Sequence, residues 1–213
     1  MPYPIEKKLV IAVSTSALFD MEESDSIYRV KGIDAYRKYQ ERMINEPLGK
    51  GVAFPFIKRI LNLNNSFPED KPIEVVIFSK NSPESGLRAF RSIAHYNLDI
   101  SRACFSSGKS NFQYLPAFNA SLFLSANPED TEKAISAGFA AGTVLDTKVI
   151  DDENDTQLRL GFDFDGVIAD DSSEQFYKEN KGNMSVYHHH ELELASNPLS
   201  NPRRSCVSFS SSI

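Results

Sequence analysis

The chain has 213 residues, of which 41% are hydrophobic and 24% charged, close to the averages for globular proteins. This composition excludes collagen, a coiled coil, wholesale disorder and a disulfide-knotted miniprotein. At roughly 100–200 residues per domain, the length fits one α/β domain plus part of another.

The net charge of −6, from 23 basic and 29 acidic residues, argues against a nucleic-acid partner. Cys104 and Cys206 are too few for a disulfide framework, and their spacing does not match a zinc site. No run of about 18 apolar residues occurs, so we expect neither a membrane-spanning helix nor a membrane partner. The first residues lack the apolar run of a signal peptide, so we expect the reducing cytosol.

The first 150 residues predict strands that alternate with helices. Apolar runs at Leu9–Val13 and Ile73–Phe78 are typical of strands buried on both faces. Shorter strands are expected at Asp99–Phe105, Ala120–Leu124 and Thr143–Leu145, and helices at about Glu22–Asn45, Gly51–Leu63, Ser82–Tyr96 and Thr131–Ala141. This order predicts a Rossmann-like parallel sheet with helices on both faces.

The pattern changes after residue 150. Residues 151–157 begin with an acidic, turn-rich run and form the expected linker, for which a solvated loop is the simplest interpretation. The apolar run Leu158–Phe162 predicts a buried strand that leads into Asp163-Phe164-Asp165-Gly166-Val167. Residues 200–213, rich in Ser and Arg, are expected to be disordered.

Two segments of the chain resemble each other at an offset of about 150 residues. Both combine a strand, a polar turn, an acidic helix and a Lys-Gly pair. Identities are few, so chance is the alternative, but the shared order favours duplication. We therefore divide the chain into a first repeat (1–150), the linker (151–157) and the start of a second repeat (158–199). The aligned positions include Ser14 with Asp163, Ser16 with Asp165, Asp25 with Glu174, Tyr28 with Tyr177, and Lys31-Gly32 with Lys181-Gly182.

The chemistry-bearing motif is the pair of carboxylates Asp163 and Asp165. A carboxylate at the tip of a strand can attack phosphorus to form an aspartyl-phosphate. A second carboxylate two residues on points the same way, can protonate the leaving oxygen and can later activate water. Gly166 would let backbone amides approach the phosphate, and Mg²⁺ would cancel the repulsion between the anions. The alternative is an acidic turn, which Asp and Gly favour in any case.

The motif Asp-x-Asp-Gly-Val resembles the first motif of the haloacid dehalogenase superfamily of phosphatases. Further segments, in order along the chain, resemble the cytosolic 5′-nucleotidase type I family. These are Leu9–Asp20 (LVIAVSTSALFD), Ala35–Gln40 (AYRKYQ), Asn45–Leu48 (NEPL), Ser79–Pro83 (SKNSP) and Leu122–Ala126 (LFLSA). The resemblance implies a haloacid dehalogenase-like fold and Mg²⁺-dependent hydrolysis of nucleoside 5′-monophosphates, typically AMP, in the cytoplasm.

The resemblance also implies roles for individual residues. Asp163 matches the nucleophile and Asp165 the general acid/base, and both would bind Mg²⁺. Ser79 matches a phosphate-binding residue, with Asn81 beside it. Lys109 is a further substrate-binding candidate, for which a plain surface lysine is the alternative.

In the first repeat, Ser14 and Ser16 stand in place of the two aspartates. A serine cannot replace a metal-binding carboxylate, so the first repeat alone is expected to be inactive. The second repeat stops after about a third of its length, so the chain resembles a truncated nucleotidase.

Three other features favour structural interpretations. Ser107-Gly108-Lys109-Ser110 is not a P-loop, because Ala103 stands where that pattern requires Gly. His188, His189 and His190 cannot all face one ion on a helix, and a polar helix face is expected. Aromatic residues that could stack on a base are more simply core residues; they are Tyr28, Tyr36, Tyr39, Phe54 and Phe56.

Three hypotheses follow. In the first, the chain is a Mg²⁺-dependent 5′-nucleotidase. In the second, it is a catalytically inactive homologue that binds a nucleotide or a protein partner. In the third, the segment with Asp163 docks beside Ser79 of the same chain or of a second subunit, so a homo-oligomer is left open.

Overall fold

The computed structural model describes residues 5–147, 150–165, 167–198 and 200. The expectations for Gly166, for Cys206 and for the tail beyond Ser200 therefore lie outside the described residues. The chain divides into two compact units, with unit 1 running to Leu158 and unit 2 beginning at Arg159. Across the described ranges, no helix is both long and apolar enough to cross a membrane.

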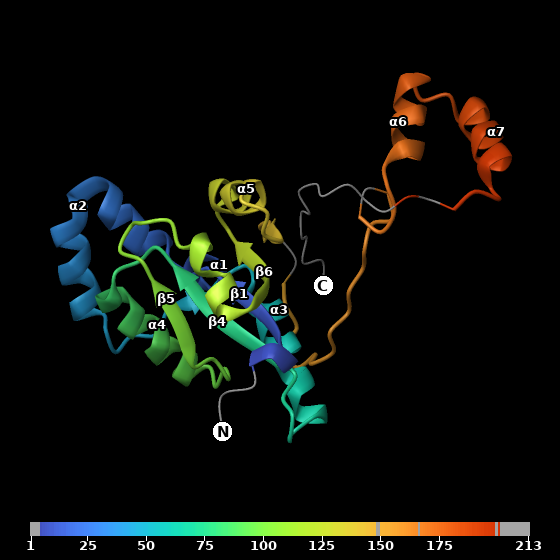
Figure 1. Cartoon of the computed structure of the whole chain (residues 1–213). Coiled ribbons are helices and arrows are strands. Elements are labelled where there is room, and N and C mark those ends of the chain that lie inside the picture. The colour runs from blue at the N-terminus through green and yellow to red at the C-terminus, as the bar shows by residue number, and fades with distance from the viewer. Residues whose placement is uncertain (1–4, 148–149, 166, 199, 201–213) are drawn as a thin grey trace. The chain divides into compact units, whose positions relative to one another are not determined.

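Unit 1 is built on a parallel sheet with the strand order β5-β4-β1-β6-β7 (Figure 1). From β1 the chain moves outward to β4 and β5, returns to β6 on the other side of β1, and ends at β7. This is the Rossmann-like order, so the predicted fold class is confirmed. The strands are β1 (Leu9–Val13), β4 (Ile73–Ser79), β5 (Arg102–Phe105), β6 (Ala120–Ser125) and β7 (Ala141–Thr143).

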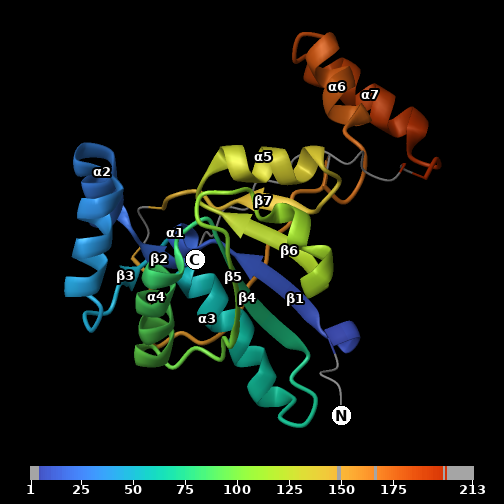
Figure 2. The same ribbon diagram turned by 60° about the vertical axis from the view of Figure 1, so that its left-hand side comes forward.

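Strand β1 is buried on both faces. Ile11 and Val13 pack into a core formed with α3 (Phe54–Asn62) and α4 (Pro83–His95). Val10 and Ala12 face the opposite core, which includes α5 (Pro128–Ser136). Figure 2 shows α3 and α4 on the opposite side of the sheet from α5. A continuous apolar run suits this central position, because neither face of the strand meets water.

Helix α2 (Glu22–Arg42) lies against α4. It is broken at Gly32, whose φ of 78° lies in the left-handed region that glycine enters without steric cost. The second half of α2 brings Tyr36 and Tyr39 into the buried interior.

A short antiparallel pair, β2 (Phe19–Asp20) with β3 (Gly49–Lys50), follows the short helix α1 (Thr15–Leu18). Gly51 comes directly after β3 and lies against the α1 backbone. A Cβ at this position would stand 2.5 Å from the carbonyl oxygen of Ala17 and 2.7 Å from the nitrogen of Phe19. Only glycine therefore permits this approach, which fixes the segment that follows β1.

The structure corrects several expected element boundaries. The helix expected to reach Ala141 ends at Ser136, because Gly138 turns the chain with a φ of 87°. Ala141 then begins β7 and pairs with β6, so this strand lies two residues before the expected one. Helix α3 begins three residues later than expected, at Phe54, and β5 begins three residues later, at Arg102.

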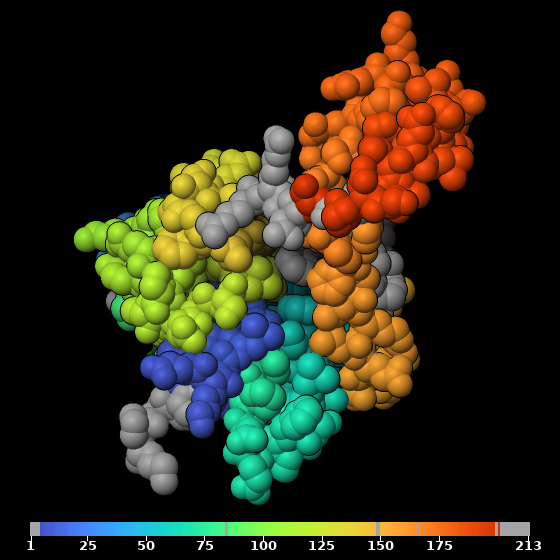
Figure 3. Space-filling model, turned by 45° about the vertical axis from the view of Figure 1, so that its right-hand side comes forward, coloured from blue at the N-terminus to red at the C-terminus, as the bar shows by residue number. Residues whose placement is uncertain are grey.

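The acidic run after residue 150 is fixed to α3 within unit 1 by Arg59. The Arg59 side chain is only 6% exposed, and its Nη2 lies 2.7 Å from Oδ1 of Asp151. Arg59 also donates to the backbone carbonyls of Asp152 (3.1 Å) and Asp155 (3.0 Å). Figure 3 shows this segment, in light orange, beside the teal α3 region. The planar guanidinium, with its five donors, thus holds three groups of one loop.

Unit 2 contains two helices that contact each other, α6 (Ser172–Glu179) and α7 (Met184–Leu194). The strand expected at Leu158–Phe162 does not form. A strand needs a partner for its backbone groups, and none pairs with this run in the described parts of the chain. Leu160 and Phe162 are 51% and 58% exposed, so the expectation of a buried strand here is wrong.

The two aligned segments share a structural detail. In unit 1, α2 is interrupted at Gly32. The rings of Tyr28 and Tyr36, on either side of the break, pack edge to face with their centroids 5.9 Å apart. In unit 2, Gly182 has a φ of 74° between α6 and α7, and Tyr177 meets Tyr187 edge to face at 5.5 Å. The helix–glycine–helix arrangement is thus common to both aligned segments.

Replacing Arg59 by Met tests the attachment of the acidic run. The variant keeps the aliphatic stem but loses a charged donor, so we expect unit 1 to lose about 2 kcal/mol of stability. Cleavage by a protease should increase within residues 151–157. The measurements are denaturant unfolding and limited proteolysis, with Lys133→Met, on the exposed side of α5, as the control. Unchanged cleavage in the Arg59 variant would contradict the attachment.

Candidate functional site

The two candidate catalytic carboxylates lie on a tight turn in unit 2. The amides of Ile168 and Ala169 both donate to the carbonyl oxygen of Phe164, each at 2.9 Å. Asp165 forms an isolated β-bridge with Ala169 and is half-buried. Asp163 is exposed, and its Oδ1 accepts a hydrogen bond from the amide of Phe164 at 2.8 Å. The turn thus presents Asp163 to solvent and partly shields Asp165.

The surroundings of Asp165 are acidic. Burial raises the pKa of the Asp165 carboxyl above its usual value, and the negative charges of Asp163, Glu191, Glu174 and Asp170 raise this pKa further. Glu174 belongs to α6 and Glu191 to α7. Two helices therefore add negative charge to the motif, which favours a proton or a cation at this place.

This donor set suits Mg²⁺ in its chemistry. Mg²⁺ prefers oxygen ligands. The carboxylates around Asp165 repel one another, and a bound cation would offset this repulsion. Within the described residues, no three acidic, His or Cys side chains converge in an arrangement that could hold a metal ion. Asp163 and Asp165 could therefore supply only part of a ligand set.

The substrate-binding candidates Ser79 and Asn81 lie in unit 1, at the carboxyl edge of the sheet. They line a cavity of about 160 Å³ together with Ser14 and Ser16. Its walls are formed by residues that follow β1, β4, β5 and β6 and by the first turn of α2. Because the strand order reverses between β1 and β6, this is the place where open α/β sheets bind ligands.

The hydroxyl of Ser14 is the centre of a small hydrogen-bonded cluster in this cavity. Ser14 is 7% exposed, and its Oγ accepts from the amide of Ala17 (3.1 Å) and from the hydroxyl of Ser125 (3.3 Å). The Oγ atoms of Ser14 and Ser16 are 3.3 Å apart. Ser79 is held similarly, since its Oγ accepts from the amide of Asn81 at 3.1 Å. In unit 1, hydroxyl groups thus occupy the aligned positions at which the unit 2 motif carries carboxylates.

Sequence reasoning did not single out four other residues that line this cavity. Thr15 Oγ1 and Asn111 Nδ2 are buried, with exposures of 1% and 3% for their residues, and neither has a partner among the residues with described positions. Lys80 forms an ion pair with Asp130 at the cavity wall. Lys80 directly follows Ser79 in the sequence, and this adjacency was the available signal.

Lys109, the third substrate-binding candidate, is exposed in the loop after β5 and is not among the residues that line the cavity. The catalytic candidates belong to unit 2 and the substrate-binding candidates to unit 1.

The three histidines and the five aromatic residues, for which structural roles were expected, agree with those roles to different extents. The expected helix carries the three histidines: His189 pairs with Glu193, and the ring of His190 stacks on Phe176 at 3.7 Å. Of the aromatic residues expected in the core, Tyr36, Tyr39 and Phe54 are buried and Phe56 packs at the edge of the core. Tyr28 is mostly exposed, because its half of α2 reaches into solvent.

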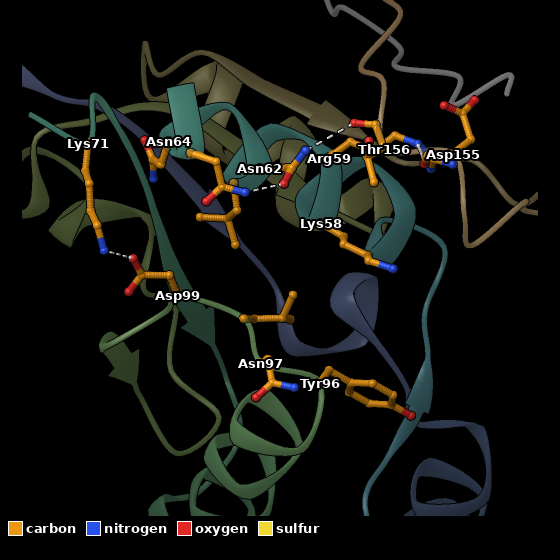
Figure 4. Close-up of a pocket in the computed structure, with 13 residues that line it drawn as sticks. Lys58, Arg59, Asn62, Asn64, Lys71, Tyr96, Asn97, Asp99, Asp155 and Thr156 are labelled. Atoms are coloured by element: carbon orange, nitrogen blue, oxygen red, sulfur yellow. Dashed lines mark hydrogen bonds and ion pairs between the residues drawn. The ribbon is translucent and has the colours of Figure 1, made fainter. Parts of the chain in front are cut away.

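A second cavity, of about 290 Å³ and larger than the first, lies at the amino-terminal edge of the unit 1 sheet (Figure 4). Its lysines are engaged: Lys71 pairs with Asp99 at 2.8 Å, and Lys58 donates to the carbonyl oxygen of Glu153. Ligands of open α/β sheets bind at the opposite, carboxyl edge. We therefore regard this second cavity as the groove in which the acidic run is fixed.

Thr15→Val tests the unpartnered hydroxyl in the carboxyl-edge cavity. The substitution removes a buried polar group that has no partner, so we expect unit 1 to gain about 1 kcal/mol of stability. The matched control is Thr131→Val. The Thr131 hydroxyl is equally buried but donates to the carbonyl oxygen of Pro128 at 2.8 Å, so the same change there should destabilise. Equal effects in denaturant unfolding would contradict this assignment.

Comparisons with known proteins agree with the motifs. The chain is 35% identical over 186 residues to human cytosolic 5′-nucleotidase 1B, an alignment that covers 84% of this chain and 30% of that protein. The chain thus spans about a third of the length of this relative. Two solved structures are also similar. One, a candidate β-phosphoglucomutase from Thermotoga maritima, has a TM-score of 0.45 and 14% identity, over 68% of this chain and 88% of that one.

The second solved structure, a candidate haloacid dehalogenase-like hydrolase from Burkholderia xenovorans, has a TM-score of 0.31 and 13% identity, over 64% of this chain and 83% of that one. The decisive match is to a family model. The model of the 5′-nucleotidase family matches residues 1–207, nearly the whole sequence. The chain therefore belongs to the 5′-nucleotidase family.

Proposed function

We propose that Asp163 and Asp165 are the nucleophile and the general acid/base of a 5′-nucleotidase that hydrolyses nucleoside 5′-monophosphates. The observation that carries the proposal is the pair of carboxylates on one tight turn, within a chain that belongs to the family. The exposure of Asp163 and the acidic surroundings of Asp165 support the division of roles.

In the first step, Asp163 attacks the phosphorus atom of the substrate. The new oxygen–phosphorus bond forms as the bond to the 5′-oxygen of the nucleoside breaks, and this leaves an aspartyl-phosphate. Asp165 donates its proton to the departing oxygen. The raised pKa of Asp165 suits this role, because it favours the protonated form from which a general acid acts.

In the second step, Asp165, now a carboxylate, removes a proton from water as the water attacks the phosphorus atom. The bond between Asp163 and phosphorus then breaks, and inorganic phosphate leaves. Both carboxylates have returned to their starting states.

Asp163 and Asp165 would hold Mg²⁺, whose charge would offset the repulsion between the carboxylates and the phosphate oxygens. AMP is the proposed substrate, on the strength of the family resemblance. A cytosolic location is proposed with it, supported by the name of the human relative.

A second candidate function is a binding module without catalysis. It is favoured by the hydroxyl cluster of Ser14, Ser16 and Ser125, because unit 1 carries a complete sheet and a cavity but hydroxyls in place of paired carboxylates.

Phosphate release from AMP, IMP, CMP and dTMP by the full chain separates these candidates. With Mg²⁺ present we expect release from AMP to be the fastest, and we expect Asp163→Asn to reduce it at least about a thousandfold, because the nucleophile is lost. Glu179→Gln removes an exposed carboxylate from the same unit and should leave release unchanged.

A folded chain that releases no phosphate from any of the four nucleotides would overturn the catalytic proposal and favour the binding module. Release that survives in Asp163→Asn would exclude the proposed nucleophile.

A further inference from the structure

The carboxyl-edge cavity of unit 1 has a counterpart in unit 2. Ser16 and Asp25 line the cavity in unit 1. Their aligned partners, Asp165 and Glu174, are close enough in unit 2 for Glu174 to raise the pKa of Asp165. Both aligned pairs therefore bring the turn and the first helix of their segment together.

The two places differ in charge. In unit 2 the aligned positions are all acidic, which suits a divalent cation. In unit 1 the hydroxyls of Ser14 and Ser16 replace two of these carboxylates and leave Asp25 as the only acid of the set. A hydroxyl can donate a hydrogen bond, whereas an ionised carboxylate can only accept. The unit 1 cavity is thus suited to a ligand that accepts hydrogen bonds.

Two buried side-chain groups without hydrogen-bond partners in the described part of the chain also indicate a ligand that accepts hydrogen bonds. Thr15 Oγ1 and Asn111 Nδ2 are donors, are buried and have no partner among the residues described in the structure. Leaving a buried donor without a partner is costly, and proteins tolerate it mostly where a water or a ligand supplies the acceptor. Two such donors line the same small space.

Lys80 supplies a positive charge at the wall. Its ammonium has three donors, and the ion pair with Asp130 uses one of them. The remaining charged group of the lining is Asp25. Burial raises the pKa of the Asp25 carboxyl, Arg29 lowers this pKa and Asp20 raises it, with a net increase.

We propose that this cavity of unit 1 binds one phosphoryl-type oxyanion without a metal ion and without chemical turnover. Its donors are Thr15, Asn111, Lys80 and the serine hydroxyls. The cavity, at about 160 Å³, is smaller than the roughly 300–1,000 Å³ of sites for drug-sized ligands. It therefore accepts the phosphoryl group alone, and the remainder of a larger phosphomonoester would lie outside.

Calorimetric titration of the full chain with inorganic phosphate, in excess EDTA, tests the proposal. We expect saturable binding that persists in Asp163→Asn, because the cavity uses neither a metal ion nor the carboxylates of unit 2. AMP, titrated into Asp163→Asn so that it is not hydrolysed, should compete with phosphate, whereas adenosine should not. Competition by AMP identifies a phosphomonoester as a ligand, and binding of inorganic phosphate alone restricts the site to the free ion.

Substitutions of residues that line the cavity should change the affinity for phosphate in opposite directions, depending on the charge removed. Lys80→Met should weaken phosphate binding about tenfold, since one charge-assisted hydrogen bond is lost. Lys133→Met, on α5 and outside the lining, should leave it unchanged. Asp25→Asn should tighten binding, because it removes the repelling carboxylate, and a cationic ligand would show the reverse. Thr15→Val should weaken binding although it stabilises the fold, so the loss cannot be a consequence of unfolding.

Absence of binding at millimolar phosphate in a folded chain would overturn the proposal. Binding that EDTA or Asp163→Asn abolishes, and that Lys80→Met leaves unchanged, would also overturn it, because the site would then be the carboxylate pair of unit 2. Failure of nucleotide hydrolysis in the earlier assay has no bearing on these titrations, so the two proposals fail independently.

Discussion

The position of β1 between β4 and β6 is the constraint on which the structure of unit 1 depends. Both edges of β1 pair in parallel, and both of its faces are covered by apolar cores. Parallel pairing aligns the carboxyl ends of three strands, so the loops that follow them converge at one edge. The amide of Ser14 then continues the pairing by donating to the carbonyl oxygen of Leu124 at 2.9 Å. Ser14, the first polar residue after β1, is thereby fixed to the sheet.

The aligned segments show how one arrangement can carry two kinds of chemistry. Each has a polar turn, a helix with an acidic residue, a break at glycine and a second helix. Aspartates on the turn concentrate negative charge, and burial together with this charge raises the pKa of Asp165. Serines on the turn instead form a neutral hydrogen-bonded cluster around Ser14. In the functions proposed for these two turns, the difference between reaction and recognition rests on a few oxygen atoms.

The sheet of unit 1 was largely predictable, because strands buried on both faces leave continuous apolar runs such as Leu9–Val13. The ends of elements were less predictable. Ala141 pairs with β6 instead of extending a helix, and this depends on a strand distant in sequence. The apolar run at Leu158–Phe162 has the composition of a strand, but composition alone does not supply a pairing partner. The strand prediction failed there for that reason.

Among the candidate site residues, too, some could be predicted from local sequence and others depend on the folded structure. Asp163 and Asp165 were identifiable because their chemistry is contained in a short motif. Thr15, Lys80 and Asn111 were not, since their significance comes from sharing one cavity while belonging to three separate segments of the chain. Lack of a hydrogen-bond partner, as for Thr15 and Asn111, is a property of the folded environment and leaves no local pattern in the sequence.

Gly51 illustrates a difficulty in interpreting natural variants of such a protein. It is not among the residues that line the carboxyl-edge cavity, yet the backbone of Ala17, Leu18 and Phe19 stands where its side chain would be. Any substitution would push on the segment that begins with Ser14. A Gly51 variant found in a population would therefore resemble a binding-site mutation in its effects, although the residue has no chemical role. The substitution would be harmful only because the backbone leaves no room for a Cβ atom.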